Sequence, residues 1–404
     1  MKITLICPYK YPYAFGIRTL SALLKEKGYQ VNLLFLPIDH WEKYNKKIVD
    51  QVAEIAGDSS VIGITLMSMF INTVASLTES LKNRCNIPIV WGGAHPTVAP
   101  NESLKFADMI CISEGETSFV TLLEKIKKGE DIANIAGIWS KRNNSIFSTP
   151  PSPLVRDLDQ LPFQDFDCKS HYLLVGDDIL KMNDEIARNF LGTTYLTIAS
   201  RGCPHACAYC INYRLNELHK GDRRIRKRSL DNLYKELVEI KKKTPFINNI
   251  WIDDDMFFVS YSTEEIRDFC GKYKENISMP LSISGATAKS LTKEKLEILV
   301  DAGLSATRIG IQSGSARTLA MYKRVQNNDE IIRAAKLANQ YKKSLRVTYD
   351  IIVDNPWELE EDLITTLKFL SRLPWPRSIS VRSLIFIPGH ISIRNGKKRR
   401  YACQ

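Results

Sequence analysis

Apolar and polar positions alternate along the first third of the chain in a pattern typical of strands joined by helices. Short aliphatic runs predict strands at residues 3–7, 31–36, 61–66, 87–91 and 109–112. Apolar residues at helical spacing predict helices at residues 17–27, 46–56, 71–81, 100–106 and 116–128. Strands that alternate with helices form parallel sheets covered on both faces. We therefore expect an α/β domain over residues 1–134 with a doubly wound, Rossmann- or flavodoxin-like sheet.

A second alternation begins after a connecting segment, residues 135–192. This segment contains a predicted hairpin, formed by residues 138–140 and 145–147, and a proline-rich linker at residues 150–153. Further strands are predicted at residues 194–198, 249–252, 281–284, 307–315, 345–353 and 379–387, and helices at 230–242, 293–302, 329–341 and 360–373. Six strand–helix units predict a partial (β/α)6 TIM-like barrel over residues 193–390, whose chemistry would lie at the carboxyl ends of the strands.

The amino-acid composition limits the classes of protein to which this chain can belong. No run approaches the ~18 apolar residues of a membrane span, and the first residues are too short an apolar stretch for a signal peptide. The nine cysteines are odd in number and scattered, which suits a reducing, cytoplasmic environment better than a disulfide scaffold. The net charge of +11 comes largely from local basic runs. No nucleic-acid module accompanies them, so we interpret them as solvated faces.

Three cysteines lie in one short loop after the first strand of the second alternation. Cys203, Cys207 and Cys210 are separated by three and by two residues, so their thiolates can reach a single metal centre. A four-iron cube held by three cysteines leaves one iron for a non-protein ligand. The spacing alone leaves two alternatives open, a zinc site completed by His205, His219 or another cysteine, and ordinary thiols.

The predicted strands of the first domain end in distinctive segments. The glycine pair Gly92-Gly93 in one of these segments allows another molecule or chain segment to approach the backbone closely. Ligands of open parallel sheets bind at this edge, the carboxyl ends of the strands. Each segment alone would be an ordinary tight turn. The segments are Thr65-Leu66-Met67-Ser68, Gly92-Gly93-Ala94-His95-Pro96-Thr97 and Ser113-Glu114-Gly115-Glu116.

These segments resemble the cobalamin-binding domain that precedes the catalytic domain of B12-dependent radical S-adenosylmethionine enzymes. The resemblance implies cobalamin contacts from Thr65, Leu66, Met67, Ser68, Gly92, Gly93, His95, Glu114, Gly115 and Glu116. Residues 8–16, after the first strand, contain no histidine, so cobalamin would bind without a histidine below the cobalt, and we do not assign His95 as a cobalt ligand. Residues 157–163 are similar to a segment that the family carries between its domains.

Residues 190–390 resemble the radical S-adenosylmethionine family. Its cluster motif matches Cys203, Cys207 and Cys210, with Tyr209 as the usual aromatic residue before the last cysteine. The resemblance implies a [4Fe-4S] cluster whose free iron binds S-adenosylmethionine. It implies cofactor contacts from Tyr209, Gln312, Ser313 and Asp350, and a less secure one from Asp254, where many members have a Gly-Gly-Glu segment. No catalytic side chain can be named.

The resemblance implies reductive cleavage of S-adenosylmethionine to a 5′-deoxyadenosyl radical, and methylation of an unactivated carbon through methylcobalamin. The expected partners are a small-molecule or natural-product substrate and an electron donor such as flavodoxin or ferredoxin. Other members of the branch catalyse radical cyclisations or rearrangements. A non-catalytic iron–sulfur or corrinoid-binding protein is the alternative of another class.

Two further features test this interpretation. Cys7, Cys85 and Cys111 only loosely resemble the additional cluster cysteines of methylthiotransferases, and we expect them to be buried thiols. Residues 391–404 form a short basic tail where the family usually continues, which suggests a truncated or frame-shifted end. The missing segment commonly shapes the substrate pocket.

Overall fold

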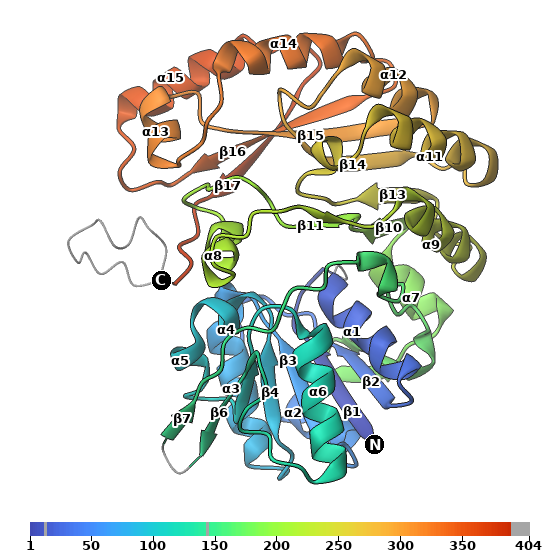
Figure 1. Ribbon diagram of the computed structural model, residues 1–404, viewed down its shortest axis with the longest axis vertical. Helices are drawn as coiled ribbons and strands as arrows, with labels where there is room; N and C mark the ends of the chain where they lie inside the picture. The colour runs from blue at the N-terminus through green and yellow to red at the C-terminus, as the bar shows by residue number, and fades with distance from the viewer. Residues whose placement is uncertain (12–13, 143–144, 389–404) are drawn as a thin grey trace. The chain divides into compact units, whose positions relative to one another are not determined.

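The computed structural model describes residues 1–11, 14–142 and 145–388, which fold into two compact units (Figure 1). The first unit comprises residues 1–156 and 160–192, and the second comprises residues 157–159 and 193–386. The predicted hairpin turn at residues 143–144 and the basic tail lie outside the described residues, as does part of the loop that follows the first strand.

The first unit is built on one nine-stranded sheet with the strand order β7-β6-β5-β4-β3-β1-β2-β8-β9. The central strands pair in parallel, in the order 2-1-3-4-5 of flavodoxin-like folds. The strands are β1 (Lys2–Cys7), β2 (Gln30–Phe35), β3 (Val61–Thr65), β4 (Ile89–Gly92), β5 (Met109–Cys111), β6 (Ile138–Arg142), β7 (Ser145–Phe147), β8 (His171–Val175) and β9 (Asp178–Lys181).

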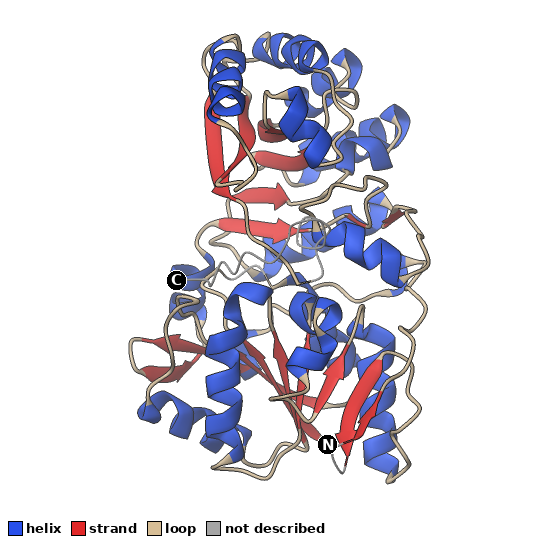
Figure 2. Ribbon diagram, turned by 90° about the vertical axis from the view of Figure 1, so that its left-hand side faces the viewer, coloured by secondary structure: helices blue, strands red, loops and turns tan. Residues whose placement is uncertain are grey.

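Helices cover both faces of this sheet (Figures 1 and 2). Helices α1 and α6 contact each other, as do α2 and α3. The core against α2 and α3 includes Trp91, which is fully buried and donates its indole N–H to Thr78 Oγ1 at 3.0 Å. The helices are α1 (Phe15–Glu26), α2 (Lys46–Ala56), α3 (Ile71–Lys82), α4 (Ala94–Val98), α5 (Pro100–Ser103), α6 (Gly115–Lys128) and α7 (Asp184–Leu191).

The connecting segment is more structured than its sequence indicates. The predicted hairpin is present as β6 and β7, which extend one edge of the sheet. A second hairpin, β8 and β9, extends the other edge through parallel pairing of β8 with β2. The sequence analysis missed it, because each strand is only four or five residues long and its pairing partner is far away in sequence.

A buried charged cluster fastens this segment to helix α1. The Asp165 carboxylate accepts a hydrogen bond from Ser21 Oγ at 2.5 Å and pairs with Lys25 Nζ at 2.7 Å and His171 Nε2 at 3.1 Å. The Arg18 guanidinium donates to the Asp165 carbonyl oxygen at 2.8 Å. Burial acts to raise the pKa of Asp165, but its hydrogen-bond donors outweigh burial and hold the pKa well below its usual range.

The second unit is a six-stranded parallel sheet with the order β10-β13-β14-β15-β16-β17, the open half-barrel that the sequence predicts. A short antiparallel pair, β11 with β12, lies outside it. The strands are β10 (Thr194–Thr197), β11 (Ser200–Arg201), β12 (Arg226–Lys227), β13 (Asn249–Ile252), β14 (Leu281–Ala286), β15 (Leu304–Gln312), β16 (Arg346–Val353) and β17 (Ser378–Ser383).

The larger helices of this unit run along one side of the sheet (Figure 1). Along β15, buried residues that face the helices alternate with half-buried residues on the open side. The helices are α8 (Ile211–Leu218), α9 (Leu230–Lys243), α10 (Phe257–Ser260), α11 (Thr263–Asn276), α12 (Lys293–Asp301), α13 (Ala316–Met321), α14 (Asn328–Asn339) and α15 (Glu360–Ser371). Among the described residues, no helix has the length and apolar character needed to cross a bilayer.

Candidate functional site

The cysteine loop connects β10 to helix α8 and is shaped by the β11–β12 pair. Gly202 lies inside this connection with φ of 95°. A Cβ at this position would lie 2.8 Å from the carbonyl oxygen of Arg224, so only glycine allows the two segments to pass each other. The Asn216 side chain donates to the Cys203 carbonyl oxygen at 3.0 Å, and Cys210 precedes the first residue of α8. The loop is therefore held at both ends.

Asp254, at the carboxyl end of β13, anchors the start of this loop. Its carboxylate accepts hydrogen bonds from the backbone N–H of Ala199 at 3.0 Å and of Ser200 at 2.6 Å. It also accepts from Ser200 Oγ at 2.5 Å and from the Met256 N–H at 2.9 Å. The sequence analysis placed Asp254 among the cofactor contacts. Because its carboxylate is buried and occupied by these donors, the geometry gives it a role in positioning the loop instead.

The three predicted ligand thiols lie near one another in this loop. Burial raises the pKa of Cys203 to about 11 and that of Cys210 to about 12, and nearby Cys207 and Asp255 add to both shifts. Within the described residues, no three or more His, Cys, Asp or Glu side chains are placed to hold a single metal ion. A four-iron cube binds each thiolate at a separate iron.

Arg324 places a positive charge beside this loop. Its Nη1 lies 3.7 Å from Cys207 Sγ and 3.3 Å from the Tyr209 hydroxyl, and its Nη2 donates to the Gly310 carbonyl oxygen at 2.7 Å. Burial disfavours the charged form of Arg324 and acts to lower its pKa. The interactions with Tyr209 and Cys207 have the larger effect, so the pKa of Arg324 is raised. The sequence analysis missed this residue, because nothing in the segment after β15 indicates that it returns to the cysteine loop. The guanidinium is suited to an anionic cluster or to a carboxylate.

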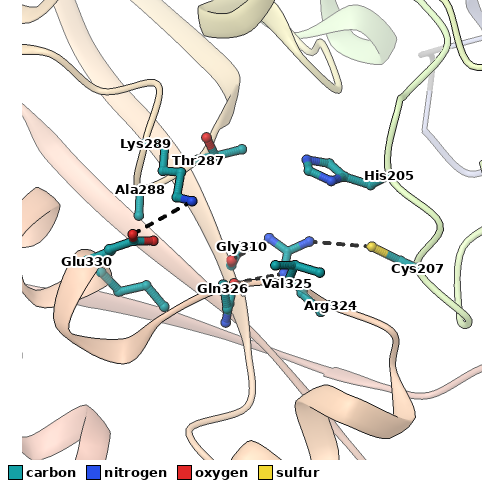
Figure 3. A pocket seen from close by; sticks show the side chains of 11 residues that line it. His205, Cys207, Thr287, Ala288, Lys289, Gly310, Arg324, Val325, Gln326 and Glu330 are labelled. Atoms are coloured by element: carbon teal, nitrogen blue, oxygen red, sulfur yellow. Dashed lines mark hydrogen bonds and ion pairs between the residues drawn. The ribbon is translucent and has the colours of Figure 1, made fainter.

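A small pocket of about 70 Å³ opens beside Arg324 (Figure 3). The cysteine loop contributes His205 and Cys207, and the carboxyl ends of β14 and β15 contribute Thr287 and Gly310. Figure 3 shows the Arg324 guanidinium directed toward Cys207. The pocket therefore joins the cysteine loop to the strand ends where the chemistry of a barrel is expected.

The remaining predicted contacts of the second unit divide into two groups. Gln312 ends β15 with φ of 71°, and its side chain lies against Gly310 at the pocket. Ser313 is 1% exposed and hydrogen-bonds with Thr366 Oγ1 of α15 at 3.0 Å, away from the pocket. Asp350 pairs with Arg308 through two hydrogen bonds on the open side of the sheet. Tyr209 and Gln312 are thus at the site, whereas Ser313 and Asp350 already have protein partners.

In the first unit, the predicted cobalamin segments meet at the carboxyl ends of the neighbouring strands β3, β4 and β5. The Leu66 N–H donates to the Gly92 carbonyl oxygen at 3.0 Å, and the His95 N–H donates to the Leu66 carbonyl oxygen at 3.1 Å. A Cβ on Gly93, whose φ is 95°, would lie 2.9 Å from Thr65 Oγ1. The second glycine is therefore required for the two turns to pack. The exposed side of this surface is formed by residues such as Met67, which is 40% exposed.

The polar residues of these segments mostly support the turns. His95, one of the predicted cobalamin contacts, is 1% exposed and its Nδ1 lies 3.2 Å from Ser68 Oγ, so its side chain supports the turn instead of reaching the surface. The Glu114 carboxylate accepts from the Val155 N–H at 3.1 Å. Gly115 begins α6, and Glu116 in its first turn is buried. The half-buried Gly92 and Gly93 and the exposed side chain of Met67 are left to form the surface at these strand ends.

Two family models match the chain in consecutive stretches. The B12 binding domain matches residues 1–123, and the radical SAM superfamily matches residues 197–370. The chain is a radical S-adenosylmethionine enzyme with a B12-binding domain. Its cofactors are a [4Fe-4S] cluster, S-adenosylmethionine and cobalamin.

Known relatives of this enzyme include methyltransferases and a cyclase. An uncharacterized methyltransferase of Pyrococcus horikoshii is 26% identical over 391 residues, which cover 92% of this chain and 78% of the relative. The anaerobic magnesium-protoporphyrin IX monomethyl ester cyclase of Synechocystis is 27% identical over 204 residues, covering 48% of this chain and 37% of the cyclase.

Among solved structures, the fold is similar to that of the radical S-adenosylmethionine methyltransferase TsrM of Kitasatospora setae. The TM-score is 0.73 with 15% identity, over 97% of this chain and 75% of that one. The TsrM structure contains a tryptophan substrate and a bound analogue of S-adenosylmethionine. At this identity the likeness shows the fold.

The residues present fit these cofactors. The three cysteines are grouped in a loop that Gly202 and Asp254 hold in place, and Arg324 supplies a charge that matches an anionic cluster or the carboxylate of S-adenosylmethionine. The strand ends of the first unit form a surface of backbone and small residues around Gly92 and Gly93. The described cysteines are all free thiols, as metal ligation requires.

Proposed function

We propose that this enzyme cleaves S-adenosylmethionine at the Cys203–Cys207–Cys210 loop and methylates a carbon of a small organic substrate. The observation that carries the proposal is the position of Arg324, which joins the cysteine loop to Gly310 at the end of β15. When bound, the cluster supplies the electron for cleavage and cobalamin supplies the methyl group. The side chains of this protein bind, orient and shield these groups.

Five side chains of the second unit would hold and orient these groups. Cys203, Cys207 and Cys210 would hold the cluster, because they are the only cysteines grouped on one loop of the second unit's described residues. Arg324 would pair with the carboxylate of S-adenosylmethionine, since its guanidinium lies 3.7 Å from Cys207 Sγ, whereas the other cation of the pocket, Lys289, pairs with Glu330. Gln312, whose side chain lies against Gly310, would contact the nucleoside part.

The first unit would bind cobalamin on the surface formed by the ends of β3, β4 and β5. Gly92 and Gly93 allow close approach to the backbone there, and Thr65 to Ser68 form the neighbouring turn. We propose no protein ligand below the cobalt. His95 is buried against Ser68, and residues 8–16 contain no histidine.

Anaerobic reconstitution tests the first half of the proposal. The full chain is loaded with iron, sulfide and cobalamin, then given S-adenosylmethionine and reduced flavodoxin or ferredoxin as the electron donor. We expect 5′-deoxyadenosine in the wild type and none above background in C203A, C207A or C210A. C270A is the matched control, because Cys270 is buried in α11 outside the loop. Full iron loading and cobalamin binding without any S-adenosylmethionine cleavage would instead identify a non-catalytic binding protein.

The methyl transfer is tested with S-adenosylmethionine that carries a deuterated methyl group. A small-molecule extract provides candidate substrates, following the tryptophan bound by TsrM. We expect a product heavier by the labelled methyl group that is absent in C207A. The similarity to the anaerobic cyclase favours an oxidative radical reaction as the second candidate. A product that has lost hydrogen and carries no label would select it.

The free cysteines indicate the redox environment in which the enzyme works. All eight cysteines that the structure describes are free, and burial rather than pairing protects Cys7, Cys111 and Cys270. We propose a reducing, cytoplasmic environment, in which the cluster ligands stay available for iron. Extraction of the enzyme from a fractionated cell would test this directly.

A further inference from the structure

The open side of the second sheet contains a cavity that the proposed reaction does not use. Its volume is about 320 Å³, within the range of small-molecule sites. Its lining comes from all six strands and is mostly polar. The side chains that define it include Thr194, Asn249, Ser282, Arg346, Thr348 and Ser380.

This cavity lies at the amino ends of the strands. Thr194, Asn249 and Arg346 are the first residues of β10, β13 and β16. The cysteine loop follows the other end of β10. On β15, the cavity is lined by Ala306, Thr307 and Arg308, whereas the pocket beside the cysteine loop is lined by Gly310, two residues further on, about 7 Å along the strand. The cavity and the pocket are therefore separate hollows that lie toward opposite ends of β15.

A hydrogen-bonded layer occupies the middle of the sheet between the two sites. Trp251 donates its indole N–H to Ser284 Oγ at 2.9 Å, and that hydroxyl donates to Asp253 at 2.9 Å. On the neighbouring strands, Arg308 pairs with Asp350. These side chains satisfy one another, and two of them, Trp251 and Arg308, line the cavity.

The charges of the cavity are unbalanced. Two arginines and no carboxylates line it, and Asp350 neutralises only Arg308. Among the described residues, the Arg346 guanidinium has no hydrogen-bond or ion-pair partner, and the same is true of the Thr348 and Ser380 hydroxyls. A free guanidinium beside free hydroxyl donors on neighbouring strands is the donor set that binds a carboxylate or a phosphate.

We propose that this cavity is a second binding site for a small organic anion with one carboxylate or phosphate head and a planar body. Arg346 pairs with the head, assisted by Thr348 on the same strand and Ser380 on β17. Trp251 and Ala306 provide the apolar wall for the body. The ligand is distinct from S-adenosylmethionine, because the cavity lies at the opposite ends of the strands. The proposal does not depend on which reaction the enzyme catalyses.

Titration calorimetry on the full chain with its reconstituted cluster tests the site, with phenyl phosphate and benzoate as separate probes. We expect one of them to bind at one equivalent and R346Q to weaken it by about tenfold or more. R333Q controls for net charge, because Arg333 lies exposed on α14, and R324Q controls for binding at the pocket. Both controls should bind as the wild type does. The stronger probe identifies the head group.

Three results would overturn the proposal. The first is that neither probe binds the wild type. The second is that R324Q loses probe binding as R346Q does. The third is that R333Q weakens probe binding as much as R346Q does. If R346Q does not fold, T348V replaces it, since the substitution removes one donor from the cavity and keeps its volume. Weaker binding in T348V then supports the site, and unchanged binding in both T348V and S380A contradicts it.

Discussion

A single guanidinium connects two strand ends of the second unit that the sequence separates by more than a hundred residues. Arg324 lies 117 positions from Cys207 yet hydrogen-bonds to its sulfur, to Tyr209 and to Gly310. Hydrogen bonds from a charged donor are roughly twice as strong as neutral ones, and a planar fork can hold a carboxylate through two of them. At the scale of residues, this is the side chain that we propose holds the carboxylate of S-adenosylmethionine beside the cysteine loop.

Replacement of Arg324 should affect S-adenosylmethionine more than the cluster. We expect R324Q to weaken S-adenosylmethionine binding by about tenfold or more, since a charged hydrogen bond contributes about 1.5–3 kcal/mol. R324K should recover part of the loss, because it restores the charge without the fork. Anaerobic equilibrium dialysis measures the affinity, and iron analysis should show equal loading. R333Q is the charge-matched control on α14. Unchanged affinity in R324Q would remove Arg324 from the site.

At the scale of elements, short segments are held in place by glycines and buried polar anchors. Gly202 permits the β11–β12 crossing, Gly93 permits the β3–β4 turns to pack, and Asp254 fixes the loop after β10. The two glycines avoid a clash between closely packed segments, and Asp254 accepts hydrogen bonds from backbone N–H groups that would otherwise be unpaired. We therefore expect these positions to control the geometry of both proposed cofactor sites.

A pair of glycine substitutions separates crowding from backbone strain. Gly202 and Gly221 both have positive φ, so alanine at either costs about 1–2 kcal/mol in backbone strain. Only at Gly202 would the new Cβ also meet a backbone oxygen, whereas nothing lies within 4 Å at Gly221. We expect G202A to lose most of its bound iron and G221A to retain it, as measured by iron content and cluster absorbance. Equal loading in both variants would contradict a shaping role for Gly202.

The Asp165 cluster should make the first unit sensitive to acid. The pKa of Asp165 in the folded protein lies well below its unfolded value of about 3.9, so its stabilisation is complete above about pH 5 and is lost progressively as the pH falls below about 4 toward the folded pKa. D165N leaves the buried His171 and the half-buried Lys25 without their carboxylate partner and should cost about 3–5 kcal/mol.

Thermal unfolding measured from about pH 6 down to about pH 2 checks this. The wild type should lose stability on acidification, and D165N should lack that component of the loss. The exposed Asp131, which pairs with Arg142 at the surface, provides the control, because D131N should change stability by no more than about 0.5 kcal/mol. Parallel pH profiles for the wild type and D165N would show that the cluster does not carry the acid sensitivity.

At the scale of the whole molecule, each cofactor set belongs to one compact unit. The cobalamin segments are confined to the first unit, and the cysteines, Arg324 and the pocket are confined to the second. Each unit also has its own sheet. Loading of one cofactor should therefore survive a defect in the other unit.

Reciprocal variants test this independence. We expect C207A to lose the cluster and keep cobalamin, and G93A to lose cobalamin affinity by about tenfold or more and keep its iron, because a Cβ there would enter the Thr65 turn. G129A, where φ is also positive but the space is open, is the control for G93A. Iron analysis and cobalamin absorbance after desalting give the two readouts. Loss of both cofactors in either variant would show that the units load together.

The local pattern of the sequence was enough to predict much of the fold and the main motifs of this protein. The alternation of apolar runs with helical periodicity was enough to predict two α/β units, because burial on both faces of a parallel sheet requires that pattern. The cysteine spacing and the glycine-containing strand ends could also be recognised in the sequence, because each depends on only a few neighbouring residues. The β8–β9 hairpin was missed because its strands are short and its partner, β2, is distant in the chain.

Only the tertiary structure decided what the polar side chains face. It turned Asp254 toward the backbone of its neighbouring loop, paired Asp350 with Arg308, and brought Arg324 to the cysteines. It also left Arg346 alone in a cavity at the other end of the same strands. Sequence periodicity reports which face of a strand is buried, but the partner of a charge depends on distances between strands that only the closed sheet fixes.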